Sequence, residues 1–405
     1  MPESNQALFD PLAWNFYSRM HEVYDRLRAA DPVHWYAYRS EWVLTRHAEV
    51  QAVLRDPTML PMQLHAGIHN LEVASGLSFP ALHQLLSASI LLQSPPGHLA
   101  TRKMLGRVLN ARPAAEYAPL MKQKARELLA TARANGGFDA ARDFAEPLPY
   151  SVIAHLLGIP EEDLPFVIEN SLDVAPMLFE RLRQPEEYRS LNARVAVALD
   201  YMEGLLRERR RAPRDDGLSR ILEFAAADPL LKNRSLAASI YFLFIAGGES
   251  TVALLSSSVL SLLNFPAQAD RWRRQEVSAE AAVEELLRFE SPAHQTIRQA
   301  TQPGVLGGKS IEPGQAVVLV LGAANRDPAV FADPHQLDLG RPRSPHVAFG
   351  DGVHACLGAT LARLEARIAL PLFLELPAPR RASETLEWCP YENIRKFKSL
   401  PLTLT

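Results

Sequence analysis

A cysteine inside a glycine-rich segment is the side chain with the most distinctive chemistry. Cys356 stands near the end of the run FGDGVHACLG, residues 349–358. Gly350 and Gly352 can adopt positive φ, so the backbone can come close to a flat ligand, and Gly358 adds no bulk beyond the sulfur. The residues after Cys356 are predicted to begin a long amphipathic helix, whose free N–H groups and positive dipole end favour a thiolate. The segment therefore predicts a sulfur ligand, and a thiolate binds iron strongly.

A carboxylate beside a hydroxyl is the second candidate group. Glu249 and Ser250 lie near the middle of an apolar segment, directly after Gly247 and Gly248. Two glycines weaken a helix, and a hydroxyl can bond back to a carbonyl four residues earlier, so we expect the helix to open locally. A carboxylate next to a hydroxyl can relay protons. The alternative is a capped kink in a core helix.

Two pairs of charged residues have helical spacing. His98 and Arg102 are four residues apart, and Glu285 and Arg288 are three apart, so each pair shares one helix face. Taken alone, the first pair is better explained by a solvated basic surface, and the second by an ordinary surface ion pair. The first pair shares its segment with the basic residues Lys103, Arg107 and Arg112.

Mainly helical elements must position these residues. The patterns predict helices at 20–30, 48–55 and 94–111, and a helical region at 112–227. Strands are predicted at 33–38 and 42–45, joined as a hairpin, and again within 293–320. Residues 56–76 are rich in Pro, Gly, His and Asn without a clear period and are predicted to form a long loop. The stretch 172–184 suits a mobile lid between two helices, although core packing explains it equally well.

The apolar segment 239–263 is long enough to cross a membrane. Glu249 lies at its centre, where a charge in lipid is costly, and two glycines and several serines interrupt it. A helix that is apolar all round is buried in something. We therefore predict a helix in the protein core.

Composition is ordinary for a soluble globular protein. Of the 405 residues, 47% are hydrophobic and 22% are charged, and the net charge of −3 gives no reason to expect nucleic acid or an anionic membrane as a partner. A disulfide between the two cysteines, Cys356 and Cys389, would sequester the proposed ligand, so a reducing, cytoplasmic compartment is expected. The N-terminal residues show neither a signal-peptide pattern nor a long apolar span, so no export and no membrane anchor are expected.

Together these segments resemble the cytochrome P-450 superfamily, the haem-thiolate monooxygenases. FGDGVHACLG, followed by ATLARLE, fits the pattern F-G-x-G-x-H-x-C-x-G without a gap, and AGGES at 246–250 resembles A-G-x-[DE]-T. The family usually has Thr where Ser250 stands, and serine lacks the methyl group that fixes the rotamer, so tight coupling of turnover is in doubt. The resemblance covers about residue 31 to the C-terminus. Without it, Cys356 would more commonly be a buried structural cysteine.

The resemblance implies a role for each matching residue. Cys356 would be the proximal ligand of the iron in haem b, iron protoporphyrin IX, where a thiolate favours O–O cleavage. Glu249 and Ser250 would deliver protons to dioxygen. Glu285, Arg288 and Arg341 would form a buried network that supports the cysteine loop. The expected haem-binding residues are His98, Arg102, Ala246, Arg298, Phe349, Gly350, His354, Cys356 and Gly358, with His98, Arg102 and Arg298 on the propionates.

The wall of a substrate pocket is expected on the side of the haem opposite Cys356. His294 could instead be a metal ligand. We prefer a place in the pocket wall, because Cys356 is already assigned as the axial protein ligand. The expected lining residues are Met177, Phe179, Phe242, Ile245, Ala246, His294, Gln295, Thr296 and Ile297.

The resemblance implies one domain, residues 1–405, with the cytochrome P-450 fold: mainly α with a small β-rich portion. The expected activity is that of a monooxygenase, an oxidoreductase acting on paired donors, which oxidises an apolar or amphipathic small molecule in bacterial secondary metabolism. Electrons would come from a separate ferredoxin and ferredoxin reductase, with the basic helix around Lys103 docking an acidic ferredoxin, and the chain is expected to be a monomer. A peroxide-driven or atypical haem enzyme, which usually lacks the acid–alcohol pair, is one alternative. A non-catalytic haem sensor or carrier, which needs no oxygen-handling helix, is the other.

Overall fold

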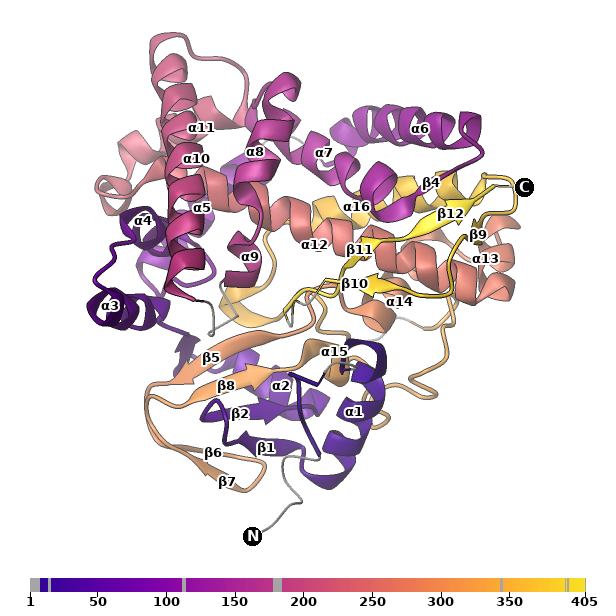
Figure 1. Ribbon diagram of the computed structural model, residues 1–405, viewed down its shortest axis with the longest axis horizontal. Coiled ribbons are helices and arrows are strands. Elements are labelled where there is room, and N and C mark those ends of the chain that lie inside the picture. The colour runs from indigo at the N-terminus through magenta and orange to yellow at the C-terminus, as the bar shows by residue number, and fades with distance from the viewer. Residues whose placement is uncertain are drawn as a thin grey trace.

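Helix α12 (Leu236–Asn264) crosses the middle of the molecule in the computed structural model (Figure 1). The structure describes residues 8–13, 16–110, 114–177, 184–342, 345–389, 391 and 393–404. The hydroxyl of Ser235 caps the start of α12 by accepting a hydrogen bond from the Ala238 N–H. The α-helices that pack most extensively against α12 are α4 (Pro80–Ala88), α7 (Pro147–Leu157), α10 (Pro185–Arg211), α14 (Ala279–Glu290) and α16 (Ala359–Leu374).

Burial explains why α12 is apolar on all sides. Within the described residues it is the one helix long and apolar enough to cross a membrane, and 83% of its most apolar window is buried inside the protein. The prediction of a core helix is therefore confirmed in position and burial.

The remaining helices complete a mainly α body. They are α1 (Phe16–Ala30), α2 (His47–Arg55), α3 (Leu64–Ser75), α5 (Gly97–Leu109), α6 (Ala118–Ala134), α8 (Leu164–Ser171), α9 (Val174–Met177), α11 (Gly217–Ala227), α13 (Pro266–Arg273) and α15 (Leu321–Ala324). Single turns lie at η1 (Ala114–Tyr117), η2 (Ala140–Ala145), η3 (Glu161–Asp163), η4 (Pro229–Leu231) and η5 (Gly352–His354). Most of the helices share one large hydrophobic core, whereas α1, α2 and α15 pack in two smaller clusters with the strands.

A five-stranded sheet lies at one end of this helical body (Figure 1). Its order is β1 (Val33–Tyr36), β2 (Glu41–Leu44), β8 (Ala316–Leu319), β5 (Thr296–Ala300) and β3 (Met59–Pro61). The pair β2 and β8 is parallel, with Val43 opposite Val318, and the other pairs are antiparallel. Side chains alternate between the two faces of this sheet. Leu44 packs in the hydrophobic cluster that contains the buried residues of α2 (the α2 cluster), whereas Val43 packs in the cluster that contains those of α1 (the α1 cluster). The predicted hairpin at 33–45 is confirmed.

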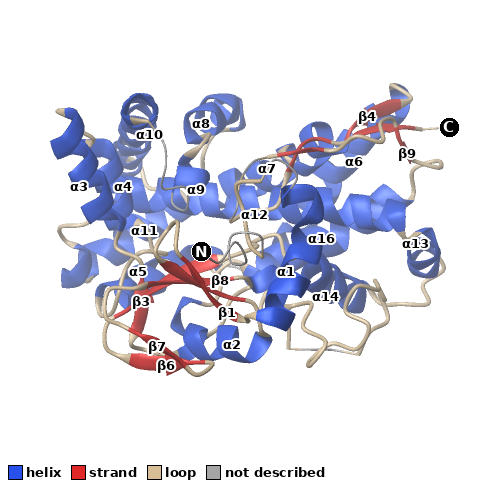
Figure 2. Ribbon diagram, turned by 60° about the horizontal axis from the view of Figure 1, so that its bottom comes forward, coloured by secondary structure: helices blue, strands red, loops and turns tan. Residues whose placement is uncertain are grey.

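The other strands are short. A three-stranded sheet has the order β4 (Gly137–Asp139), β12 (Pro401–Thr403) and β9 (Arg380–Arg381). Two hairpins complete the set, β6 (Gly304–Leu306) with β7 (Lys309–Ile311) and β10 (Glu387–Trp388) with β11 (Phe397–Ser399). Figure 2 shows that β4 and β9 lie at the opposite end of the molecule from the five-stranded sheet.

The predicted loop at 56–76 is wrong, because this stretch contains β3 and α3. The apolar residues Leu64, Ile68 and Leu71 have helical spacing, but His, Gly and Asn between them hide the pattern. Gly76 ends α3 in the left-handed conformation, with φ of 71°, and Ile68 is buried. The end of the proposed lid, residues 178–183, lies outside the described residues.

Candidate functional site

A cavity of about 310 Å³ separates α12 from the cysteine segment. Cys356 lines one side, and Ala246, Glu249 and Ser250 of α12 line it as well. Ala246 is exposed although the helix around it is buried, which marks the place where the packing around α12 opens. Residues from α5, β5 and α16 contribute the remaining walls.

Backbone hydrogen bonds fold the cysteine segment into a tight loop. The Cys356 N–H donates to the Phe349 carbonyl at 2.8 Å, and the Gly350 N–H donates to the Val347 carbonyl at 2.9 Å. Gly350 and Gly352 have φ of 66° and 68°, as predicted. A Cβ on Gly352 would also lie 2.6 Å from the Leu54 carbonyl oxygen, so α2 packs directly on this loop.

The Cys356 side chain is exposed and lines the cavity. Burial raises the pKa of the Cys356 thiol, whereas the Gly358 N–H and the cations of Arg102 and Arg363 act to lower it. The Gly358 N–H at the start of α16 acts in the predicted direction, but burial outweighs it. A bound metal cation deprotonates a coordinating thiol outright, so metal binding and thiolate formation occur together here.

Four basic side chains gather at the cavity: His98, Arg102, Arg298 and His354. The His98 and His354 rings lie with centroids 4.0 Å apart, and neither of the buried ring nitrogens of His98 has a hydrogen-bond partner among the described residues. Burial, followed by the charges of His98, Arg298 and Arg102, lowers the pKa of His354 to about 3. Burial alone lowers the pKa of Arg298 to about 10. Such a cluster lacks a negative partner.

These features fit a haem. In the part of the chain that the structure describes, none of the four basic residues forms an ion pair, and the Arg102 guanidinium donates instead to the Ala355 carbonyl at 2.7 Å. Two propionates would supply the missing negative charge, because arginine forks onto carboxylates and histidine can donate to them. A Cβ on Gly350 or Gly358 would meet no atom within 4 Å, so both glycines leave open space along the cavity. The residues present thus suit a flat dianionic group with a sulfur ligand.

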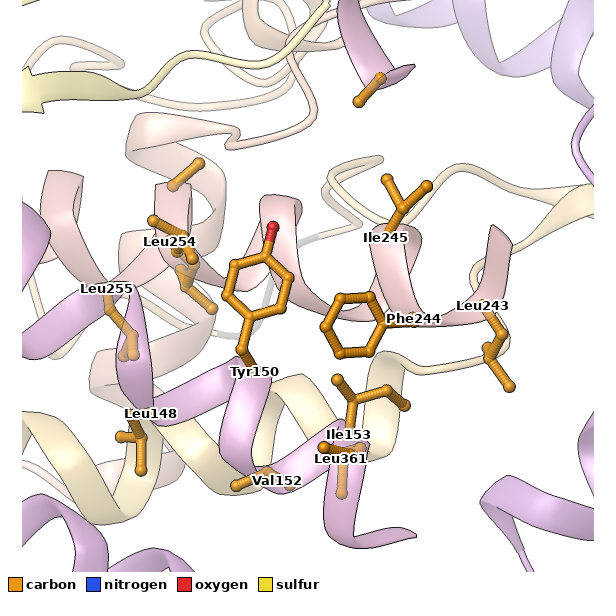
Figure 3. Close-up of a cluster of buried hydrophobic side chains, with 14 of the residues drawn as sticks. Leu148, Tyr150, Val152, Ile153, Leu243, Phe244, Ile245, Leu254, Leu255 and Leu361 are labelled. Atoms are coloured by element: carbon orange, nitrogen blue, oxygen red, sulfur yellow. The ribbon is translucent and has the colours of Figure 1, made fainter. Parts of the chain in front are cut away.

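On the opposite wall, hydroxyl groups bond back to α12. The Ser250 hydroxyl donates to the Ala246 carbonyl at 3.0 Å, as predicted. However, α12 is continuous through this segment, so the predicted local opening of the helix is not found. A Cβ on Gly248 would overlap the Tyr150 ring, and one on Gly247 would press on Ile153, so the two glycines instead allow α7 to pack closely on α12. Figure 3 shows Tyr150 of α7 within a cluster of buried hydrophobic side chains. The centroid of its ring lies 5.1 Å from that of the Phe244 ring.

Glu249 has two partners from other elements. Its carboxylate accepts hydrogen bonds from the Tyr150 hydroxyl at 3.1 Å and from Nζ of Lys396 in the β10–β11 hairpin at 2.8 Å. Burial lowers the pKa of Lys396, but the Glu249 carboxylate outweighs this effect and the pKa is raised. Burial and the same carboxylate raise the pKa of Tyr150 well above its usual value. Sequence reasoning missed both partners, because no spacing links them to Glu249.

The three residues of the expected buried network are in contact. Arg288 forks onto Glu285 at 2.7 and 2.8 Å, and Nε of Arg341 lies 3.1 Å from both Glu285 carboxylate oxygens. Arg288 is completely buried and also donates to the Asn325 carbonyl at 2.9 Å. The Asn325 side chain accepts from the Val347 N–H at 2.7 Å, which connects the network to the cysteine loop.

The predicted pocket wall is partly correct. Phe242, Ile245, Ala246, Gln295 and Thr296 line the cavity, and Arg298 lines it too. The prediction for Ile297 is wrong: strand residues alternate in direction, so Ile297 points away from the cavity and packs in the α1 cluster.

Two further pocket predictions are corrected. His294 is fully buried away from the cavity, stacked on Tyr24 with centroids 5.5 Å apart. Burial, with the charges of Arg395 and Arg326, lowers the pKa of His294 to about 3. Met177 is buried in the helical core and does not line the cavity, because α9 turns its side chain into that core. Phe179 lies outside the described residues.

One carboxyl group of the cavity was not predicted. Glu365 of α16 lines the cavity, and its Oε2 has no hydrogen-bond partner among the described residues. Burial raises the pKa of Glu365 to about 8. Glu365 is the last residue of the run ATLARLE, nine residues after Cys356. This position in the sequence could have indicated that it lies at the site.

Comparison with known proteins points to one family. The family model for cytochrome P450 matches residues 167–376. The chain is 32% identical to the biotin biosynthesis cytochrome P450 of Bacillus subtilis, over 96% of this chain and 97% of that protein. It is 35% identical to the vitamin D(3) 25-hydroxylase of Pseudonocardia autotrophica, over 98% and 96%. The crystal structure of P450BioI in complex with hexadec-9Z-enoic acid ligated acyl carrier protein is 31% identical, with a TM-score of 0.88 over 96% of this chain and 100% of that chain.

Proposed function

Because this chain belongs to the cytochrome P450 family, we propose that Cys356 is the haem-iron ligand of a monooxygenase that oxidises an apolar or amphipathic small molecule. The chain is a bacterial-type P450 monooxygenase with the P450 fold, and the cofactor of this family is haem. One observation carries the proposal: Cys356, Glu249 and Ser250 line the same cavity. When bound there, the haem supplies the redox centre at which dioxygen is activated.

We propose that the basic side chains hold the haem propionates. His98, Arg102, Arg298 and His354 line the cavity, and none of them forms an ion pair with a described residue. Phe349, Gly350 and Gly358 form the floor beside the sulfur, and Ala246 faces it from α12. The arrangement supports one haem held by a sulfur ligand at its centre and by cations at its edge.

We propose that Glu249 and Ser250 move protons into the cavity. Glu249 is hydrogen-bonded to Lys396 and Tyr150, so it can exchange protons with these two side chains. The Ser250 hydroxyl lines the cavity and would donate into it when it rotates away from the Ala246 carbonyl. Glu249 would therefore accept a proton from the Lys396 ammonium and pass it on, and the Ser250 hydroxyl would be the last donor.

Replacement of Ser250 with alanine tests this role. The Ser250→Ala variant is expected to keep its haem and bind substrate, because the hydroxyl contacts only the Ala246 carbonyl among the described residues. The fraction of electrons recovered in oxidised product is expected to fall by about an order of magnitude or more, as for loss of a general acid. Stoichiometry of NAD(P)H consumed, product formed and hydrogen peroxide released measures this fraction.

Ser256→Ala is the matched control, because that hydroxyl also bonds back within α12, to the Val252 carbonyl at 2.8 Å, but lies outside the cavity. It should leave the coupling unchanged, and Ser250→Thr should preserve it. Equal coupling in Ser250→Ala and the unmodified protein would contradict the proton-relay role and favour peroxide-driven chemistry or a haem sensor.

The substrate is proposed to be apolar or amphipathic, in a bacterial biosynthetic pathway of secondary metabolism. Phe242 and Ile245 give the cavity an apolar wall, and Gln295 and Thr296 are its polar handles. Two relatives support this class by their names, since one acts on vitamin D(3) and the other is solved with an acyl carrier protein bearing a fatty acid. A carrier-bound acyl chain is thus one form in which such a substrate could arrive.

We propose electron delivery by a separate ferredoxin and its reductase. Lys103 and Arg107 are exposed on α5, the helix whose Arg102 reaches the cysteine loop. Arg112 lies outside the described residues. Reversal of both charges, Lys103→Glu with Arg107→Glu, is expected to slow reduction by an acidic ferredoxin about tenfold at low salt, since such charges steer association. Stopped-flow reduction measures the rate, and substrate-induced spectral shifts should not change.

The control reverses two exposed charges away from α5, Arg380→Glu in β9 with Lys398→Glu in β11 (Figure 1). It should leave the reduction rate within a factor of two. An unchanged rate in the α5 variant would remove this docking surface.

The pairing of β2 with β8 supports a single domain, because it joins residues 41–44 to residues 316–319 in one sheet. We further propose a cytoplasmic monomer. Both cysteines are free, and α12 is covered by protein.

A further inference from the structure

Two ion pairs join α14 to α16 one helical turn apart. Glu284 pairs with Arg363, at 2.5 Å to Nε and 2.9 Å to Nη2, and Glu280 pairs with Arg367 at 3.5 Å. The two pairs have the same chemistry. They differ in what lies next to them.

Arg363 lies against the cysteine loop. Its guanidinium is stacked over the Phe349 ring, 4.4 Å from the centroid. Phe349 lines the cavity and its carbonyl accepts the hydrogen bond from the Cys356 N–H, whereas Arg363 itself does not line the cavity. Arg363 therefore sits behind the ring, and the cation–π contact fixes both groups.

Glu284 ties this arginine to the loop a second time. Its carboxylate oxygen Oε2 lies 3.1 Å from Nε2 of His346, and Nδ1 of His346 accepts the Ala348 N–H at 3.3 Å. These two contacts assign the Nε2–H tautomer to the neutral ring. Burial raises the pKa of Glu284, but hydrogen bonds from His346 and Arg363 bring it down to about 2, so the carboxylate is ionised.

The position of Arg363 has an electrostatic consequence. Arg363 is one residue removed from Cys356, because its guanidinium stacks on Phe349 and the Phe349 carbonyl accepts the Cys356 N–H at 2.8 Å. A positive charge in this place stabilises a negative sulfur. A fixed cation beside a thiolate also stabilises the additional electron when ferric haem is reduced to ferrous haem. Glu284 carries a negative charge, and in the series of contacts from Cys356 through Phe349 to Arg363 it comes next after Arg363.

We propose that Arg363 is a positioning residue that sets the reduction potential of the haem, and that Glu284 and Phe349 hold its guanidinium against the cysteine loop. This inference rests on the proposed function, since it requires a haem on Cys356. The step concerned is the uptake of one electron by ferric haem, supplied in the test by a mediator at an electrode.

Spectroelectrochemical titration of the haem-loaded protein tests the inference through the sign of two shifts. Arg363→Met removes a positive charge and is expected to lower the ferrous-to-ferric ratio at a fixed potential about tenfold, which is a shift of about −59 mV for one electron. Glu284→Gln removes a negative charge and should raise that ratio severalfold. Loosening of the loop alone would move both variants in the same direction.

The second pair provides matched controls, because Glu280→Gln and Arg367→Met break the same kind of contact without touching Phe349. Both should remain within twofold of the unmodified protein. Arg363→Lys, which keeps the charge but not the fork, should lie within threefold of it. Shifts of the same sign for Arg363→Met and Glu284→Gln, or an Arg363→Lys shift as large as that of Arg363→Met, would overturn the inference. If the unmodified protein lacks the spectrum of a thiolate-ligated haem, the proposed function fails instead.

Discussion

Replacement of Cys356 with serine is expected to abolish monooxygenase turnover and the spectrum of a thiolate-ligated haem. A serine hydroxyl stays protonated near neutral pH and is a poor ligand for haem iron, whereas the cysteine sulfur deprotonates when it binds the metal. The basic cluster of His98, Arg102, Arg298 and His354 stays intact in this variant. Residual haem can therefore bind through its propionates, and absorption spectra of the ferrous carbonyl adduct distinguish it from native ligation.

Cys389→Ser is the matched control for this experiment. Cys389 is buried near the β10–β11 hairpin, where burial raises its pKa to about 11, and it does not line the cavity. This variant should keep haem content, spectrum and turnover. Retention of the native carbonyl spectrum by Cys356→Ser would show that another residue is the ligand.

The second large effect is expected for Arg288→Met. Arg288 is fully buried, and its loss leaves the Glu285 carboxylate with Arg341 and the Asp338 N–H and leaves the Asn325 and Pro334 carbonyls without their donor. Removal of one member of a buried charge network costs about 3–5 kcal/mol. Urea-induced unfolding should show this loss in the free energy of unfolding. Haem occupancy is also expected to fall, because Asn325 supports the cysteine loop at Val347.

Arg189→Met is the control, because Arg189 also pairs with a glutamate three residues away but is 65% exposed. An exposed pair of this kind is worth about 0–1 kcal/mol, so little change is expected. If the two variants lose similar stability, the buried network does not support the fold in the way described.

The local part of the site was predictable because it depends on neighbouring residues. The cysteine loop needs positive φ at Gly350 and Gly352, and the run of residues around Cys356 displays this need directly. The Glu285–Arg288 contact follows from helical spacing in the same way. The order of the motifs was sufficient to indicate the mainly α fold that the structure matches confirm.

Long-range and directional features were harder to predict. Lys396 meets Glu249 across 147 residues, and Arg363 meets Glu284 across 79, so no local spacing connects either pair. The predicted wall at 294–297 failed in part because a strand places consecutive side chains on opposite faces: Thr296 faces the cavity and Ile297 does not. Helix α3 was missed because Ile68 is its one fully buried residue.

The most direct test of the central claim is the absorption spectrum of the ferrous carbonyl adduct of the unmodified protein. If Cys356 ligates haem iron, the Soret band is expected at the long wavelength typical of thiolate ligation. A colourless protein, or a band at the shorter wavelength typical of histidine ligation, would contradict the assignment of Cys356 as the ligand.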